Sequence, residues 1–181
     1  MQTKFNEMVL TLKKPGQDII DSWTPAKASA AHMLTGLLDE FFELAEAAIE
    51  MYSFYSEGNR KNVLEEAGDL LFYIEGLAQD LNLPKIPLVK AELETLPSSL
   101  MVMLNIITPV KRHLYYNKEL DVVTLVAALE NLASTTLLTA FDAGYELDEV
   151  LEANMVKLLK GRYKSGYSDE AANKREDKTE A

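Results

Sequence analysis

Two pairs of acidic residues have the type and spacing that could do chemistry. Glu40 and Glu43 are three positions apart, and Glu66 and Asp69 repeat that spacing. On a helix, this spacing places both carboxylates of a pair on neighbouring ridges, about 5 to 6 Å apart at Cβ. Four carboxylates brought together repel one another by about 3 kcal/mol per pair at about 5 Å and an effective dielectric near 20, and a divalent cation would relieve that repulsion. Oxygen ligands in this number favour Mg²⁺, with Mn²⁺ as a substitute, over Zn²⁺.

A solvated face is the alternative interpretation, because acidic residues at helical spacing usually point into water. For the first pair alone it is the stronger interpretation, since other acids lie on the same side of that helix. Glu66 and Asp69 instead lie on a helix that is apolar on most sides, where an unpaired buried carboxylate is costly. Gly68 between them lowers helix stability, which predicts close approach by another backbone or a ligand. Taken together, the two pairs favour a cation site.

Residue types exclude several other chemistries. The chain has no cysteine, and therefore no disulfide, thiolate metal ligand or cysteine nucleophile. Its two histidines, His32 and His113, are not preceded three positions earlier by glutamate, as a di-iron carboxylate bundle requires. The glycine-rich signatures of P-loop and dinucleotide-binding proteins and the GxSxG of serine hydrolases are also absent.

Composition and charge indicate one globular domain. The chain has 181 residues, of which 48% are hydrophobic and 26% charged, enough for a sizeable core. Its net charge of −11 repels nucleic-acid phosphates, so we expect no nucleic-acid polymer as a partner. The longest uncharged stretch, residues 95–110, contains two prolines and is too short to span a bilayer, and the start of the chain does not resemble a signal peptide. We expect a cytoplasmic protein with no membrane partner.

The elements that must position these acids are helices. Glycine and proline are few, and long segments consist of Leu, Ala, Glu and Met, which are favourable in helices. We predict an all-α bundle of about six helices, at residues 5–13, 26–55, 60–81, 100–116, 121–143 and 147–160. A bend is expected at Pro109, a loop at 21–25 and a polar tail at 161–181.

Apolar residues at three- and four-residue steps predict how the two acidic helices pack. On helix 26–55 one face consists of Leu34, Leu37, Leu38, Phe41, Ala45, Ala48 and Tyr52. Helix 60–81 is apolar almost all round and is expected to lie at the centre of the bundle. A turn is predicted at residues 56–59, so an antiparallel pair of helices would bring the four acids face to face.

The chain also contains a faint internal repeat. A shift of 62 residues aligns residues 64–83 with 126–145 and matches Asp80 with Asp142. So few identities between segments of similar composition are as compatible with chance as with duplication. At this offset the four acids correspond to Val102, Asn105, Ala128 and Asn131. We therefore describe the single domain as an acidic half at about 27–83 and an acid-poor half at about 88–160.

The acids and their surroundings resemble a known family. The pattern ExxE, a spacer and then ExxD is similar to that of the all-α nucleoside triphosphate pyrophosphohydrolases, the MazG-like superfamily. Residues 32–37 (HMLTGL) and 63–71 (VLEEAGDLL) resemble the family's two acidic segments, and residues 154–158 (NMVKL), 162–163 (RY) and 166–168 (GYS) resemble its ending in phage and bacterial members. The likeness covers about residues 27–83 and 147–175, and residues 88–146 resemble the second half of tandem members more loosely.

The resemblance implies a Mg²⁺-dependent enzyme that cleaves a nucleoside triphosphate between its α and β phosphates, giving the monophosphate and pyrophosphate. Glu40, Glu43, Glu66 and Asp69 would hold the cation and act as the catalytic residues, with one of them taking a proton from the attacking water. Glu65 is another candidate base, although it points about 100° away from Glu66 on a helix. The expected substrate is a deoxynucleotide, removed for nucleotide-pool control or housecleaning.

Further residues are candidates for binding the substrate. Polar groups on and after the last helix lie within reach of a phosphate, although cations there can also complement a helix C-terminus. Two residues nearer the N-terminus could line a base pocket, with core packing as the alternative for each. The candidates are Asn154, Lys157, Arg162, Tyr163, His32 and Trp23.

Assembly and function class leave alternatives open. Apolar faces left over after packing, together with the resemblance, favour a homodimer or a pair of dimers, whereas a tandem chain could form an internal pseudo-dimer. A non-catalytic nucleotide- and Mg²⁺-binding interaction module is the main alternative to an enzyme, and it is disfavoured because both acidic pairs are intact. In a purely structural dimerisation module, the carboxylates would be surface charges only.

Overall fold

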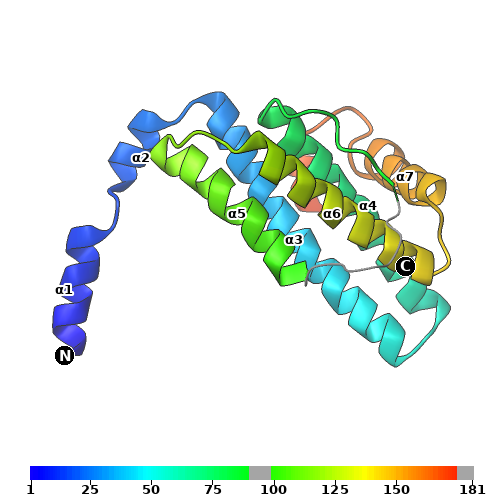
Figure 1. The fold of residues 1–181 in the computed structure, drawn as a ribbon. Coiled ribbons are helices and arrows are strands. Elements are labelled where there is room, and N and C mark those ends of the chain that lie inside the picture. The colour runs from blue at the N-terminus through cyan, green and yellow to red at the C-terminus, as the bar shows by residue number, and fades with distance from the viewer. Residues whose placement is uncertain (90–98, 175–181) are drawn as a thin grey trace.

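The computed structural model describes residues 1–89 and 99–174. These residues form helices and no β-strand, which confirms the predicted all-α class (Figure 1). The elements are α1 (Gln2–Leu12), α2 (Gly16–Ser22), α3 (Pro25–Ser53), α4 (Glu57–Asp80), α5 (Ser99–Tyr116), α6 (Val122–Asp142), α7 (Leu147–Met155), the π-helix η1 (Val156–Arg162) and α8 (Asp169–Lys174). Parts of the predicted acid-poor half and of the polar tail, residues 90–98 and 175–181, lie outside the described residues.

α3 and α4 form an antiparallel hairpin with the most extensive helix–helix contact among the described elements (Figure 1). α3 begins after Thr24, whose side chain accepts a hydrogen bond from the backbone N–H of Lys27, and Pro25 stands in its first turn. α4 begins after Ser56, which accepts from the backbone N–H of Asn59 in the same way. A turn between the acidic helices is therefore confirmed, but it lies at residues 54–56 instead of the predicted 56–59, because the Ser56 cap starts α4 at Glu57.

The buried face of α3 matches the predicted stripe in its first half only. Leu34, Leu37 and Phe41 are buried as predicted, but the buried positions then continue through Leu44, Ala47 and Met51. Tyr52, predicted to pack in this stripe, is 63% exposed, and its hydroxyl donates a hydrogen bond to Asp142 at the end of α6. The prediction was wrong there because the apolar residues of α3 fit two overlapping stripes, and packing against the other helices selects one.

α4 lies at the centre of the bundle, as predicted. It contacts α3, α6 and α7, and a second hairpin, α5–α6, packs beside the first (Figure 1). A shift of 62 residues along the sequence aligns the last residue of α4, Asp80, with the last residue of α6, Asp142. In the second hairpin, Val102 and Ala128 are buried in the core where the first hairpin carries acids. Pro109 lies inside α5, which continues on both sides of it.

Three segments differ from their predicted structure. Residues 16–22 form the short helix α2, for which the sequence predicted no helix, and Pro15 stands at its N-cap. The last predicted helix changes at Met155 into the π-helix η1, whose end is marked by the backbone N–H of Tyr163 bonding to the carbonyl of Leu158. Residues 169–174 of the polar tail form α8, which the Ser168 hydroxyl caps by accepting from the Ala171 N–H.

α1 projects away from the bundle and has no buried residue (Figure 1). Its apolar side chains, including Phe5, Leu10 and Leu12, are exposed. Among the described residues, only α6 is long and apolar enough to cross a membrane. Buried positions make up 39% of its most apolar window, and a core helix of a bundle meets the same criteria.

Candidate metal and nucleotide site

Three carboxylates from the first hairpin meet in the fold. Glu40 and Glu43 of α3 and Glu66 of α4 each offer an oxygen, and these oxygens all lie within 4.8 Å of one another. Glu66 is the most buried of the three, at 4% exposure. The antiparallel arrangement of the helices thus brings the two acidic pairs together, as the turn between them predicted.

Asp69, the fourth predicted acid, is held by side chains of α7 and η1. The Asn154 side-chain amide donates to Asp69 Oδ1 at 2.7 Å, and the Lys157 ammonium bonds to Asp69 Oδ2 and, at 2.7 Å, to Glu65 Oε1. Gly68 allows this approach, because a Cβ there would lie 2.9 Å from the Asn154 Cβ. Gly68 therefore has a close neighbour, but this neighbour is a side chain of α7 and not the backbone or ligand that the sequence predicted.

The acids interact strongly even though Asp69 is held separately. The pKa of Glu40 is raised from 4.5 to about 8, first by burial and then by the charges of Asp69, Glu43 and Glu66, while Lys157 lowers it. Glu40 Oε2 is buried and accepts no hydrogen bond from the residues that the structure describes. This buried oxygen, which receives no hydrogen bond there, lies beside two further carboxylates. The three carboxylates together form a set of oxygen ligands that fits a hard cation such as Mg²⁺ or Mn²⁺.

The raised pKa of Glu40 predicts that the metal-free protein loses stability as pH rises. A carboxyl with a higher pKa in the folded chain binds its proton more tightly there, so the free energy of unfolding falls between about pH 4.5 and about pH 8. Glu40→Gln is expected to be more stable than wild type at about pH 8, by about 2 kcal/mol after allowance for solvent screening, and to be nearly equal to it below about pH 4.5.

Urea denaturation in EDTA at the two pH values would measure this difference. The exposed Glu50→Gln is the matched control, since it removes the same charge from the same helix outside the cluster. If Glu40→Gln were no more stable than the control at high pH, the charge on Glu40 would not destabilise the folded protein, and the raised pKa would be contradicted.

A cavity of about 320 Å³ opens beside the acids. We call it the aromatic cavity. Glu40 and Asp69 lie in its wall, and the rest of the wall consists of His32, Met33, Phe72, Tyr73, Leu158, Arg162, Tyr163 and Tyr167. The ring of Tyr73 stands edge-on to His32, and the Tyr163 and Tyr167 rings lie 5.5 Å apart. A space of this size, with aromatic walls and charged groups at its edge, can enclose a planar polar ring.

Comparison of the chain with protein-family models, with curated proteins and with solved structures finds no match. Its function therefore rests on its own residues.

The structure brings most of the predicted substrate-binding residues to this site. His32, Arg162 and Tyr163 line the aromatic cavity, while Asn154 and Lys157 hold Asp69. Trp23 does not line the cavity. Its ring packs edge-on against Tyr115 of α5, with the ring centroids 5.3 Å apart. Trp23 therefore packs within the protein, which is the alternative that the sequence left open to binding the base.

Sequence reasoning missed Met33, Phe72, Tyr73, Leu158 and Tyr167 as cavity residues. For Tyr73 and Met33, a signal exists in the glycines of the two helices. A Cβ at Gly36 would lie 2.1 Å from the Tyr73 ring, and one at Gly76 would lie 2.5 Å from the Met33 sulfur. Glycine inside a helix is unfavourable by itself, so each of these positions indicates a large side chain pressed against the backbone.

Gly36→Ala is expected to displace the Tyr73 ring from the cavity wall. The clash with this half-buried ring should lower the free energy of unfolding by about 2 kcal/mol. Gly58→Ala is the matched control, because a Cβ there meets only the Ser56 hydroxyl, at 3.9 Å, and it should stabilise α4 by about 0.5 to 1 kcal/mol. Urea denaturation of both variants measures the difference, and equal stability would show that Tyr73 moves without cost.

Proposed function

We propose that the protein is a Mg²⁺-dependent nucleotide pyrophosphohydrolase that cleaves a nucleoside triphosphate, preferably a deoxynucleotide, to the monophosphate and pyrophosphate. The observation that carries this proposal is the meeting of Glu40, Glu43 and Glu66 in one cluster, of which Glu40 also lines the aromatic cavity together with Arg162. The likeness of these segments to the MazG-like superfamily supports it. A role in nucleotide-pool control or housecleaning follows from that reaction.

Glu40, Glu43 and Glu66 would hold the cation, with Asp69 as a further ligand if its contacts with Asn154 and Lys157 open. When bound, Mg²⁺ would neutralise the triphosphate and polarise the phosphoryl oxygens. Glu65 is less suitable as the base, because its carboxylate is already bonded to Lys157. One of the clustered carboxylates would therefore act as the general base and accept the proton of the attacking water.

The aromatic cavity would orient the nucleotide. Stacking on Tyr163 or Tyr73 would fix the base, and Arg162 would pair with a phosphate. With the base held, the phosphate chain would lie along the acids in the cavity wall. Water then forms a bond to the α-phosphorus as the bond from that phosphorus to the bridging oxygen breaks, and pyrophosphate leaves with the bonding electrons.

A non-catalytic nucleotide- and Mg²⁺-binding module is the second candidate function. The observation that favours it is the engagement of Asp69, because a carboxylate already bound by an amide and an ammonium is a weaker metal ligand. Such a module would bind nucleotide and cation in the same cavity without turnover.

Assembly into a homodimer or a pair of dimers is also proposed. The exposed apolar side chains of α1 support it, because α1 buries none of them within its own chain. Gel filtration with light scattering, before and after removal of residues 1–14, tests it.

The test of the proposed function is incubation with a panel of canonical and modified NTPs and dNTPs, with Mg²⁺ or with EDTA. Phosphorus NMR distinguishes pyrophosphate and monophosphate from the phosphate and diphosphate that γ-cleavage would give. Mg²⁺-dependent pyrophosphate release supports the proposal. If no member of the panel is hydrolysed, while nucleotide with Mg²⁺ still raises the melting temperature, the non-catalytic module is the correct function.

A further inference from the structure

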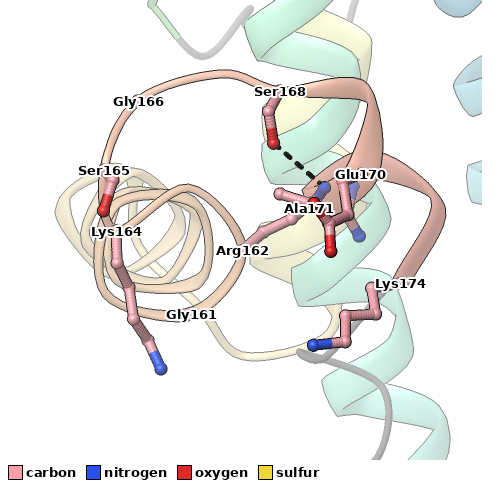
Figure 2. Close-up of a pocket in the computed structure, with 9 residues that line it drawn as sticks. All are labelled: Gly161, Arg162, Lys164, Ser165, Gly166, Ser168, Glu170, Ala171 and Lys174. Atoms are coloured by element: carbon pink, nitrogen blue, oxygen red, sulfur yellow. Dashed lines mark hydrogen bonds between the residues drawn. The ribbon is translucent and has the colours of Figure 1, made fainter.

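A second pocket lies beside the aromatic cavity, between the end of η1 and α8 (Figure 2). It has a volume of about 230 Å³, and its polar lining comes from Arg162, Lys164, Ser165, Ser168, Glu170 and Lys174. We call it the lysine pocket. The described part of its lining contains no aromatic side chain, in contrast to the aromatic cavity.

The charge of the lysine pocket is opposite to that of the chain. Among the residues that the structure describes, three cations and one acid line it, although the protein carries a net charge of −11. Figure 2 shows Lys164 and Lys174 reaching from opposite walls toward the same side of the pocket. Two ammonium groups, a guanidinium and two hydroxyls around a small space form a lining that suits a compact polyanion.

The two pockets share a wall. Arg162 lines both of them, and the residues that follow it are divided between the two, with Tyr163 and Tyr167 in the aromatic cavity and residues 164–166 in the lysine pocket. A turn holds this segment, because the Gly166 N–H donates to the Tyr163 carbonyl at 3.0 Å. Gly166 has φ of 92°, a backbone conformation that favours glycine.

We propose that the lysine pocket binds the pyrophosphate end of the substrate and, after cleavage, the pyrophosphate product. The ligand's identity rests on the proposed function. A nucleotide whose base lies in the aromatic cavity and whose α-phosphate lies at the acids directs its β and γ phosphates past Arg162, which is the residue common to both pockets. A cation at the acids neutralises only part of the triphosphate's negative charge, and the lysines then balance the remainder.

Direct binding of inorganic pyrophosphate, measured by calorimetry in EDTA, tests the proposal without turnover. EDTA prevents a cation from recruiting the anion to the acids. Lys164→Ala and Lys174→Ala are each expected to weaken pyrophosphate binding by about 10-fold. Lys160→Ala is the matched control: Lys160 is exposed on η1 and lines neither pocket, so it should change binding by less than about twofold. All three lysines are exposed, and melting curves confirm folding.

Binding of a nucleoside monophosphate separates this pocket from the aromatic cavity. The monophosphate lacks the pyrophosphate end, so its affinity should be the same in wild type and in both lysine variants. The proposal is overturned if wild type does not bind pyrophosphate, or if Lys160→Ala weakens pyrophosphate binding as much as Lys164→Ala and Lys174→Ala do. It is also overturned if these two variants lose as much affinity for the monophosphate as for pyrophosphate. Lysine-dependent pyrophosphate binding by a protein that hydrolyses no nucleotide would retain this site and reject the proposed function.

Discussion

Replacing Glu66 with glutamine is expected to reduce pyrophosphate release by about 1,000-fold, equivalent to about 4 kcal/mol of transition-state stabilisation. Glu66 is the most buried carboxylate of the cluster, and its oxygen lies within 4.8 Å of those of Glu40 and Glu43. Glutamine keeps the shape of the side chain and one carbonyl oxygen but removes the negative charge. The bundle therefore stays folded while its affinity for a cation falls.

Two measurements would check this result together. The first is kcat/KM for pyrophosphate release at saturating Mg²⁺, and the second is the rise in melting temperature that Mg²⁺ causes. Both should fall in Glu66→Gln. Without Mg²⁺ the variant should melt no lower than wild type, since one of the mutually repelling charges has been removed.

Glu46→Gln is the matched control for Glu66→Gln. Glu46 is exposed on α3 and lies outside the cluster, so its substitution removes the same charge without touching the site. Its kcat/KM should stay within about twofold of wild type. If Glu66→Gln instead retained more than about a tenth of the wild-type kcat/KM and the full effect of Mg²⁺, the acidic cluster would not be the reaction centre.

The meeting of the acids could be predicted because it depends on local rules. A three-residue spacing defines one side of a helix, and the short connection before Ser56 requires α3 and α4 to run antiparallel. The engagement of Asp69 could not be predicted in the same way. Its partner Asn154 is 85 residues away in the sequence, and only the packing of α7 against α4 brings the two together.

The aromatic cavity shows a second limit of the sequence. Phe72 and Tyr73 lie within the helix predicted at residues 60–81, where a core residue and a cavity residue have the same type and spacing. Phe72 is 47% exposed and lines the cavity, although α4 itself is central. Hydrophobicity predicts that a side chain leaves bulk water, but it does not distinguish a protein neighbour from a ligand.

Replacing Lys157 with methionine is expected to lower the free energy of unfolding by about 3 kcal/mol in the absence of divalent cations. Lys157 bridges Asp69 and Glu65, with its side chain and that of Asp69 each 13% exposed. Methionine keeps most of the apolar stem and ends before the position of the ammonium, so the variant removes the charge and leaves two acids without this cation. Lys160→Met on the exposed side of η1 is the matched control and should change stability little.

This loss should not depend on pH in the neutral range. Burial lowers the pKa of Lys157, but the charge of Asp69 and the hydrogen bonds with Asp69 and Glu65 outweigh it, so the pKa lies above 10.5. A lysine with a raised pKa contributes its stability in full below the unfolded value and loses it only as pH rises through the folded value. Urea denaturation at about pH 6 and about pH 7, where Glu40 with its pKa of about 8 stays protonated, should therefore give the same difference between Lys157→Met and wild type.

Mg²⁺ distinguishes a structural role of Lys157 from a role in binding substrate. Without the ammonium, Asp69 is held by Asn154 alone and can more easily turn toward the other acids, so Mg²⁺ should stabilise Lys157→Met more than it stabilises wild type and restore most of the lost melting temperature. If Lys157 also balances the charge of the triphosphate, kcat/KM stays about 100-fold low even at saturating Mg²⁺. Recovery of activity together with stability would instead show that Lys157 only stands in for the cation and that Asp69 completes the metal site.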